Sequence, residues 1–145
     1  MIKSIIVILF IILFISHKLI AKDISHDESY NLYQSGALII DVRNKSEWKE
    51  TGIIPKSKLV PMLTHARTLR NDFIDNLIST IGEDKSIKVG IICRSGGRSS
   101  ATVTMLKDKG YKNIYNMSEG LVGDGEKTGW ISRGYPIIGC GNKCK

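Results

Sequence analysis

The sequence predicts an α/β domain in which a mostly parallel central sheet is flanked by layers of helices. Two observations carry this prediction. Short runs of strand-forming residues at 38–42, 87–92 and 113–116 are typical of strands buried inside a parallel sheet. Two segments with helical spacing of apolar residues, 64–81 and 99–109, alternate with those runs. Alternating strands and helices are the pattern of a layered α/β fold.

The first predicted elements are short. Residues 29–34 form one or two helical turns that end near Gly36. The strand at 38–42 follows, and residues 58–62 form another strand, which Pro61 stops because proline has no N–H to donate.

The longest predicted helix covers residues 64–81. Its apolar side chains recur every four residues and therefore share one face, and Gly82 ends it. The central strand at 87–92, the helix at 99–109 and the strand at 113–116 complete the predicted domain.

The motif that carries chemistry is Cys-Arg-Ser-Gly-Gly-Arg-Ser at residues 93–99. It follows the central strand and runs into a helix, so Cys93 lies at the carboxyl edge of the sheet, where α/β proteins bind ligands. Converging loop N–H groups, the helix N-terminus and the charges of Arg94 and Arg98 all favour a thiolate. The alternative is an inert buried cysteine, but apolar cores rarely hold such charged neighbours. We therefore predict that Cys93 is a nucleophile beside an anion site.

This loop resembles the active-site loop of the rhodanese family of single-domain sulfurtransferases. Four residues separate Cys93 from Arg98, one fewer than in the longer loop of cysteine-dependent phosphatases. The chain departs from the family pattern at Ile53, where His is common, and at Lys56-Ser57, where Gly-Ala is usual. The resemblance covers roughly residues 29–138 and rests also on Leu-Ile-Ile-Asp-Val-Arg at 38–43, Glu-Trp at 47–48, Gly-Ile-Ile-Pro at 52–55, Tyr-Lys-Asn-Ile-Tyr-Asn at 111–116, Glu-Gly at 119–120, Gly-Trp at 129–130 and Gly-Tyr-Pro-Ile at 134–137.

The resemblance implies a rhodanese-like layered fold and a thiosulfate sulfurtransferase that forms a persulfide on Cys93. Its partners would be a small anionic sulfur donor and a thiophilic or thiol acceptor, and it would need no metal and no organic cofactor. The substrate-binding residues it implies are Arg94, Ser95, Gly96, Gly97 and Arg98. The residues it implies for supporting the loop are Asp41, Arg43 and Ser99.

The first 21 residues have the pattern of a secretory signal peptide. Lys3 supplies an early positive charge, residues 5–15 are apolar and uncharged, and Ala21 offers a small residue for cleavage. The apolar run is short for a membrane span, which needs about 20 residues, but an uncleaved anchor stays open. We expect a periplasmic or otherwise exported protein, with residues 22–28 as a short disordered polar lead, 29–138 as the domain and 139–145 as a tail.

The tail holds two of the three cysteines. Cys140 and Cys144 can pair in an oxidising compartment, which leaves Cys93 as the free reactive thiol. The open alternatives for the tail pair are a resolving or sulfur-accepting role and a metal contact.

Composition excludes other classes of function. The formal net charge is +7, but the lysines and arginines form no dense run, so we expect no nucleic-acid partner. His26 lies in the polar lead and His65 opens the 64–81 helix, so neither indicates a cysteine–histidine protease. We expect Trp48 and Trp130 to be core aromatics. We also expect a monomer that contacts membranes only if the leader stays uncleaved.

Two further functions stay open at this stage. One is a thiol redox or persulfide-carrier module in which Cys93 exchanges with Cys140 and Cys144. The other is a non-enzymatic domain that uses the anion pocket only to dock a partner.

Overall fold

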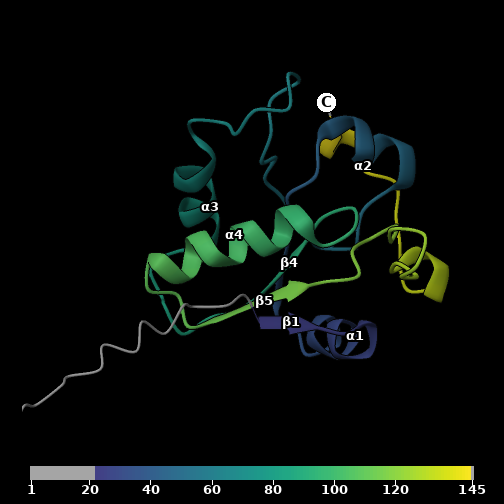
Figure 1. Cartoon of the computed structure of the whole chain (residues 1–145), viewed down its shortest axis with the longest axis horizontal. Helices are drawn as coiled ribbons and strands as arrows, with labels where there is room; N and C mark the ends of the chain where they lie inside the picture. Colours follow the sequence, from purple (N-terminus) through teal and green to yellow (C-terminus); the bar gives the residue numbers. More distant parts are fainter. Residues whose placement is uncertain (1–21, 145) are drawn as a thin grey trace, which may run out of the picture.

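The computed structural model describes residues 22–144, which form a five-stranded sheet with helices on both faces (Figure 1). The strand order is β1-β5-β4-β2-β3, and every pairing between these strands is parallel. The predicted α/β class and parallel sheet are thus confirmed. The predicted leader, residues 1–21, lies outside the described residues.

The elements alternate along the chain as the sequence pattern indicates. The strands are β1 (Lys22–Ile24), β2 (Leu38–Asp41), β3 (Lys58–Leu59), β4 (Lys88–Ile92) and β5 (Asn113–Met117). The helices are α1 (His26–Gln34), α2 (Lys45–Thr51), α3 (Phe73–Ile81) and α4 (Gly97–Asp108), and two 3-10 helices follow at Ile131–Arg133 and Gly141–Cys144.

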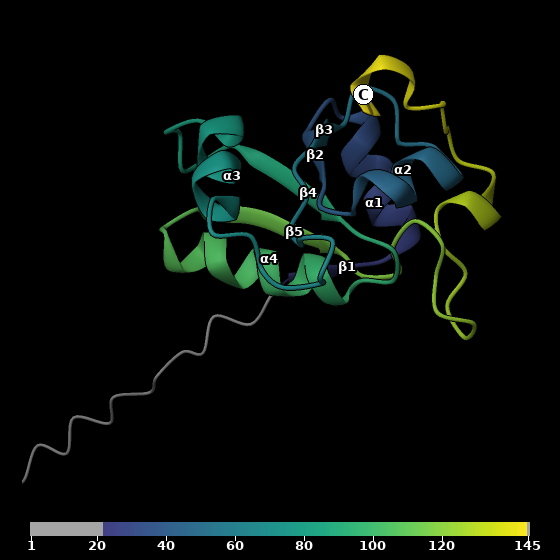
Figure 2. The same cartoon turned by 90° about the horizontal axis from the view of Figure 1, so that it is seen from above.

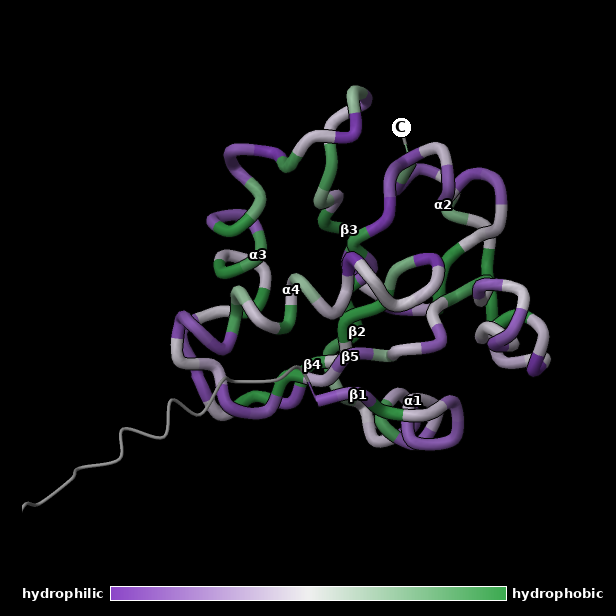
Figure 3. The backbone as a smooth tube through the Cα atoms, viewed as in Figure 1, coloured by the Kyte–Doolittle hydropathy of each residue, from purple (hydrophilic) through white to green (hydrophobic). Residues whose placement is uncertain are grey.

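Successive strand residues point to opposite faces of the sheet, and each face carries a core. Ile40, Val89 and Ile91 pack with residues of α3 and α4, whereas Ile39 and Ile92 pack with residues of α1. In Figure 1, α4 lies above β4 and β5 while α1 lies below them, and α2 lies apart from α3 both there and in Figure 2. The most hydrophobic backbone follows β2 and β4 (Figure 3).

The polar lead predicted at 22–28 is wrong, because these residues are part of the fold. Lys22–Ile24 forms the edge strand β1, and α1 begins at His26. The Ser25 Oγ accepts from the Glu28 N–H, and the Glu28 carboxylate accepts from the Ser25 N–H, which is a capping box. Three residues are too few to show strand periodicity, and Ile24 is the single buried one among them.

The predicted helix at 64–81 is only half right. Helix α3 covers Phe73–Ile81, and residues 64–72 form an irregular loop that contains His65. Arg67 has a φ of 61° in that loop, which a helix does not allow. Leu69 is 49% exposed, so its helical spacing from the core residues of α3 is coincidental.

Helix α2 is absent from the sequence prediction. Its seven residues carry a single buried side chain, Trp48, so they have no apolar stripe to detect.

Both tryptophans are buried, as expected, with Trp48 at 4% and Trp130 at 1% exposure. Among residues 22–144, no helix is both long enough and apolar enough to cross a bilayer.

Candidate active site

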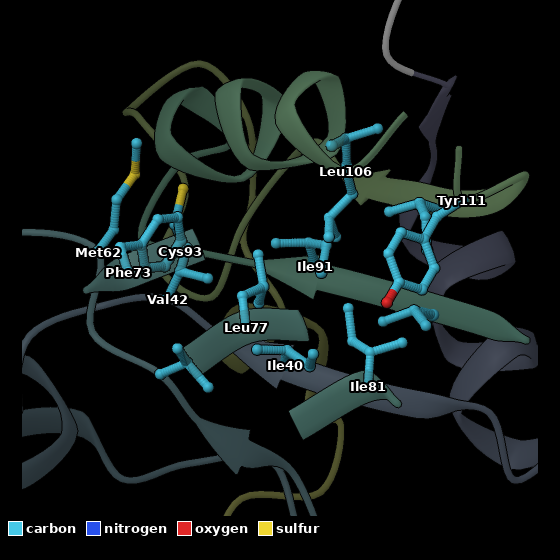
Figure 4. Packing of buried hydrophobic residues seen from close by; sticks show 14 residues of the cluster. Ile40, Val42, Met62, Phe73, Leu77, Ile81, Ile91, Cys93, Leu106 and Tyr111 are labelled. Carbon is cyan, nitrogen blue, oxygen red and sulfur yellow. The ribbon is translucent and has the colours of Figure 1, made fainter. Parts of the chain in front are cut away.

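The loop between β4 and α4 places Cys93 at the carboxyl edge of the sheet. Because side chains alternate along β4, Cys93 points to the same face as Ile91 and enters the core beneath the start of α4. Figure 4 shows its sulfur near the labelled side chains of Val42, Met62 and Phe73. The residue is only 1% exposed.

Polar groups surround the sulfur on the loop side. The Gly96 N–H donates to Cys93 Sγ at 3.2 Å, and Ser99 Oγ lies 3.3 Å from the same sulfur. Ser99 Oγ also donates to the Gly96 carbonyl at 3.0 Å. Since α4 begins at Gly97, its N-terminus and the Gly96 N–H are the groups that favour negative charge on the sulfur.

The segment after β5 holds the loop in place from outside. The Leu121 N–H donates to the Cys93 carbonyl at 2.9 Å, and the Val122 N–H donates to the Arg94 carbonyl at 3.0 Å. Gly96 has a φ of 99°, and a Cβ there would lie 2.0 Å from the Ser118 carbonyl oxygen. The tight turn at Gly96 therefore needs glycine on both counts.

The two arginines of the loop differ in their surroundings. Arg94 is exposed, and its side chain has no ion-pair or hydrogen-bond partner within residues 22–144. Arg98, in the first turn of α4, forms a two-pronged pair with Glu47 of α2. Its Nη1 lies 2.8 Å from Glu47 Oε2, and its Nη2 lies 2.7 Å from Glu47 Oε1. Arg43, four residues before Glu47, meets only the Glu47 backbone carbonyl, at 3.3 Å from its Nη1.

Each member of the Arg98–Glu47 pair shifts the pKa of the other towards its charged form. Burial raises the pKa of Glu47, but hydrogen bonds from Arg98 and from the Asn44 N–H outweigh burial, so this pKa is lowered overall. The pKa of Arg98 is raised, first by its hydrogen bond to Glu47 and also by the nearby negative charges of Glu47, Cys93 and Asp41. Both side chains are therefore charged at neutral pH.

The comparison with known families decides the classification. The model of the rhodanese-like domain matches residues 25–126, which is more than half of the chain. The chain belongs to the rhodanese-like domain family. That family generally carries sulfurtransferase activity.

This rhodanese-like domain matches two of the following three relatives over nearly their whole length. An uncharacterized protein of Rickettsia prowazekii, RP600, is 31% identical over 120 residues, covering 81% of this chain and 98% of that protein. Rv0390 from M. tuberculosis has a TM-score of 0.69 at 26% identity, covering 82% of this chain and 98% of that one. The polysulfide-sulfur transferase homodimer from Wolinella succinogenes has a TM-score of 0.60 at 26% identity, covering 81% and 78%.

The other two predicted loop residues of the rhodanese-like domain differ in exposure. Ser95 is half-buried in the loop, and Gly97 is exposed at the start of α4. In the described part of the chain, no cluster of three or more His, Cys, Asp or Glu side chains is arranged as a metal site.

The rhodanese-like domain buries Asp41 and Arg43 completely as an ion pair. Arg43 Nη2 lies 2.7 Å from Asp41 Oδ2 and donates to the Gly52 carbonyl at 2.8 Å. Arg43 Nη1 donates to Thr51 Oγ1 at 2.7 Å. The pair thus fastens β2 to the end of α2, and none of these hydrogen bonds reaches the Cys93 loop. Its support for the loop is indirect, because α2 carries Glu47.

The tail of the rhodanese-like domain is folded against α2. Cys140 and Cys144 form a disulfide, and both pack with Trp48 and Ile53. Within residues 22–144, Cys93 is the free cysteine, and it belongs to a different core cluster from the tail pair.

The contact between His26 and Glu119 is not predicted from the sequence. It is 5% exposed, its ring contacts the Glu119 carboxylate, and its backbone N–H donates to the same carboxylate at 3.0 Å. The ring nitrogen also lies 3.4 Å from Thr128 Oγ1. His26 therefore ties the start of α1 to the segment that braces the Cys93 loop. A local sequence pattern cannot reveal this contact, because 93 residues separate His26 from Glu119.

The pKa of His26 predicts a pH dependence of stability. Burial lowers this pKa from 6.5 and Arg133 lowers it further, while Glu119 and Asp27 oppose them without reversing the shift. The folded state therefore favours the neutral His26 ring. The contribution of this ring to the free energy of unfolding is fully present above pH 6.5 and is lost as the pH falls towards the pKa of the folded state. We expect the free energy of unfolding to decline below pH 6.5 in urea titrations, and His26→Gln to flatten that decline. An equal slope in the variant would contradict this assignment.

Proposed function

We propose that this chain is a sulfurtransferase that carries sulfane sulfur as a persulfide on Cys93. One observation carries the proposal: Cys93 Sγ accepts from the Gly96 N–H at 3.2 Å, at the N-terminus of α4. A helix N-terminus and a converging N–H group stabilise a thiolate and, after transfer, the anionic outer sulfur of a persulfide. Membership of the rhodanese-like family supports the same chemistry.

The reaction proceeds in two nucleophilic displacements. The Cys93 thiolate attacks the outer sulfur of thiosulfate, the S–S bond of thiosulfate breaks, and sulfite leaves with the bonding electrons. The products are a Cys93 persulfide anion and sulfite, so three negative charges stand on each side. An acceptor such as cyanide then attacks the outer sulfur of the persulfide, forming thiocyanate and restoring the thiolate. No electron or proton has to be supplied from elsewhere.

The burial of Cys93 shapes how a donor would bind. Since the residue is 1% exposed, only the terminal sulfur of a donor reaches it, and the charged end of the donor stays at the rim. Arg94, the residue after Cys93 in the chain, is an exposed guanidinium that could meet that charged end. Thiosulfate and polysulfide both present a terminal sulfur. The Wolinella succinogenes relative, a polysulfide-sulfur transferase, makes polysulfide the second candidate donor.

A redox exchange between Cys93 and the tail pair has less support. The tail disulfide packs on Trp48, whereas Cys93 lies in the core beneath α4. The disulfide does support our further proposal that the protein is exported, because disulfides persist in oxidising compartments. The apolar run at residues 5–15 points in the same direction.

The test is the intact mass of the purified protein after incubation with thiosulfate. We expect a gain of one sulfur atom, peptide mapping to place it on Cys93, and cyanide to remove it with release of thiocyanate. The tail disulfide serves as the internal reference, since its peptide should keep its mass. If no sulfur is gained from thiosulfate or from polysulfide, the proposed function is wrong.

A further inference from the structure

Glu47 occupies the groups of Arg98 that would otherwise bind a donor. Both terminal nitrogens of Arg98 are engaged by the Glu47 carboxylate, at 2.7 Å and 2.8 Å. Glu47 Oε2 also accepts from the Asn44 N–H at 2.9 Å, which fixes the carboxylate in place. The side chains are 22% exposed for Arg98 and 17% for Glu47, so solvent screens this pair only in part.

The charge at the loop follows from that pairing. Arg94 and Arg98 bring two positive charges and Glu47 brings one negative charge, so these three side chains together carry one net positive charge. A guanidinium that already holds a carboxylate by two hydrogen bonds offers a donor anion little further binding. The carboxylate also repels any second anion that approaches Arg98. A donor with two negative charges is therefore penalised more than a donor with one.

We propose that Glu47 sets the donor class of this enzyme by favouring monoanionic sulfane-sulfur donors over dianionic ones. This inference rests on the proposed function. Glu47 acts through Arg98 and touches no reacting atom, so it is a specificity-determining positioning residue. It lies on α2, which the buried Asp41–Arg43 pair and the tail disulfide both fasten to the rest of the domain.

Two small donors differ in charge but hardly in shape. Thiosulfate is a dianion, and methanethiosulfonate is a monoanion in which a methyl group replaces one oxygen. With the second donor, the Cys93 thiolate attacks the outer sulfur, the S–S bond breaks, and methanesulfinate leaves with the electron pair. The reactants and the products of that step each carry a total of two negative charges. Both donors leave the same Cys93 persulfide, so any difference arises in donor binding and the first displacement.

The experiment compares kcat/KM for the two donors, with cyanide as acceptor, in the natural protein and in Glu47→Gln. Glutamine keeps the shape and an oxygen acceptor for Arg98 but removes the charge. We expect the ratio of kcat/KM for thiosulfate to that for methanethiosulfonate to rise on the order of tenfold. The rise should come from KM for thiosulfate and should shrink at high ionic strength. Because both donors are measured on one preparation, unfolded protein cancels from the ratio.

Glu50→Gln is the matched control. Glu50 is exposed on the same helix and is not paired with Arg98 in the structure, so the variant changes net charge equally and should leave the ratio within about twofold. An unchanged or lower ratio in Glu47→Gln would overturn the proposal, as would an equal rise in Glu50→Gln. If the natural protein transfers sulfur from neither donor nor from polysulfide, the proposed function itself has failed, which is a separate result.

Discussion

Cys93→Ser is expected to lower sulfur transfer by at least about a thousandfold, because a serine hydroxyl is hardly ionised near neutral pH and is a weak nucleophile without a base. Within residues 22–144, the hydrogen-bond partners of the sulfur are the Gly96 N–H and Ser99 Oγ, and neither is a base that could compensate. Thiocyanate release from thiosulfate and cyanide measures the loss. The smaller oxygen fits the same buried space, so we expect circular dichroism and the melting temperature to change little.

A double variant, Cys140→Ser with Cys144→Ser, is the control for that result. It removes the other two cysteines but leaves the Cys93 loop untouched, so it should retain sulfur transfer. Residual activity near the natural level in Cys93→Ser would exclude Cys93 as the sulfur carrier. Full activity in Cys93→Ser combined with loss in the double variant would move the chemistry to the tail.

Asp41→Asn is expected to give the largest loss of stability. Arg43 is completely buried and charged, and Asp41 is the carboxylate that neutralises it, accepting from Nε and Nη2. Removing one partner of a buried ion pair leaves an uncompensated charge, which costs about 3–5 kcal/mol. Urea unfolding followed by tryptophan fluorescence measures the change, since both tryptophans are buried.

Asp75→Asn is the comparison for this effect. Asp75 lies exposed on α3, so the same chemical change there should alter the free energy of unfolding by no more than about 0.5 kcal/mol. A loss below about 1 kcal/mol in Asp41→Asn would show that the pair is solvated in solution and does not hold α2.

The sequence predicts the sheet and the loop well, because their signals are local. Buried parallel strands are continuous apolar runs, and the loop from Cys93 to Ser99 joins a strand to a helix within a few residues. The sequence pattern does not reveal helix α2 because Trp48 is its single buried side chain. Residues 64–72 mislead because Leu69 keeps helical spacing in a segment that Arg67 turns out of helix.

Local sequence patterns cannot predict that Arg98 pairs with Glu47. Glu47 is 51 residues away and lies on the helix that the sequence does not reveal, whereas Arg43 stands four residues from it. Charge counting predicts that Arg98 needs a counter-ion or a ligand, but only the tertiary fold decides which. The identity of the partner matters, because an unpaired Arg98 would bind an anion directly, whereas an Arg98 paired with Glu47 has its positive charge largely neutralised.

The edge position of β1 has a consequence for the order of folding. Asp23 of β1 accepts a hydrogen bond from Asn116 of β5 at 2.8 Å across 93 residues of chain, and β1 is only three residues long. Closing so long a loop carries an entropic penalty that three residues of pairing can hardly offset early. We therefore expect β1 to join after the transition state, once β2, β4 and β5 are in place. Substitutions that weaken β1 should then speed unfolding and leave the folding rate nearly unchanged.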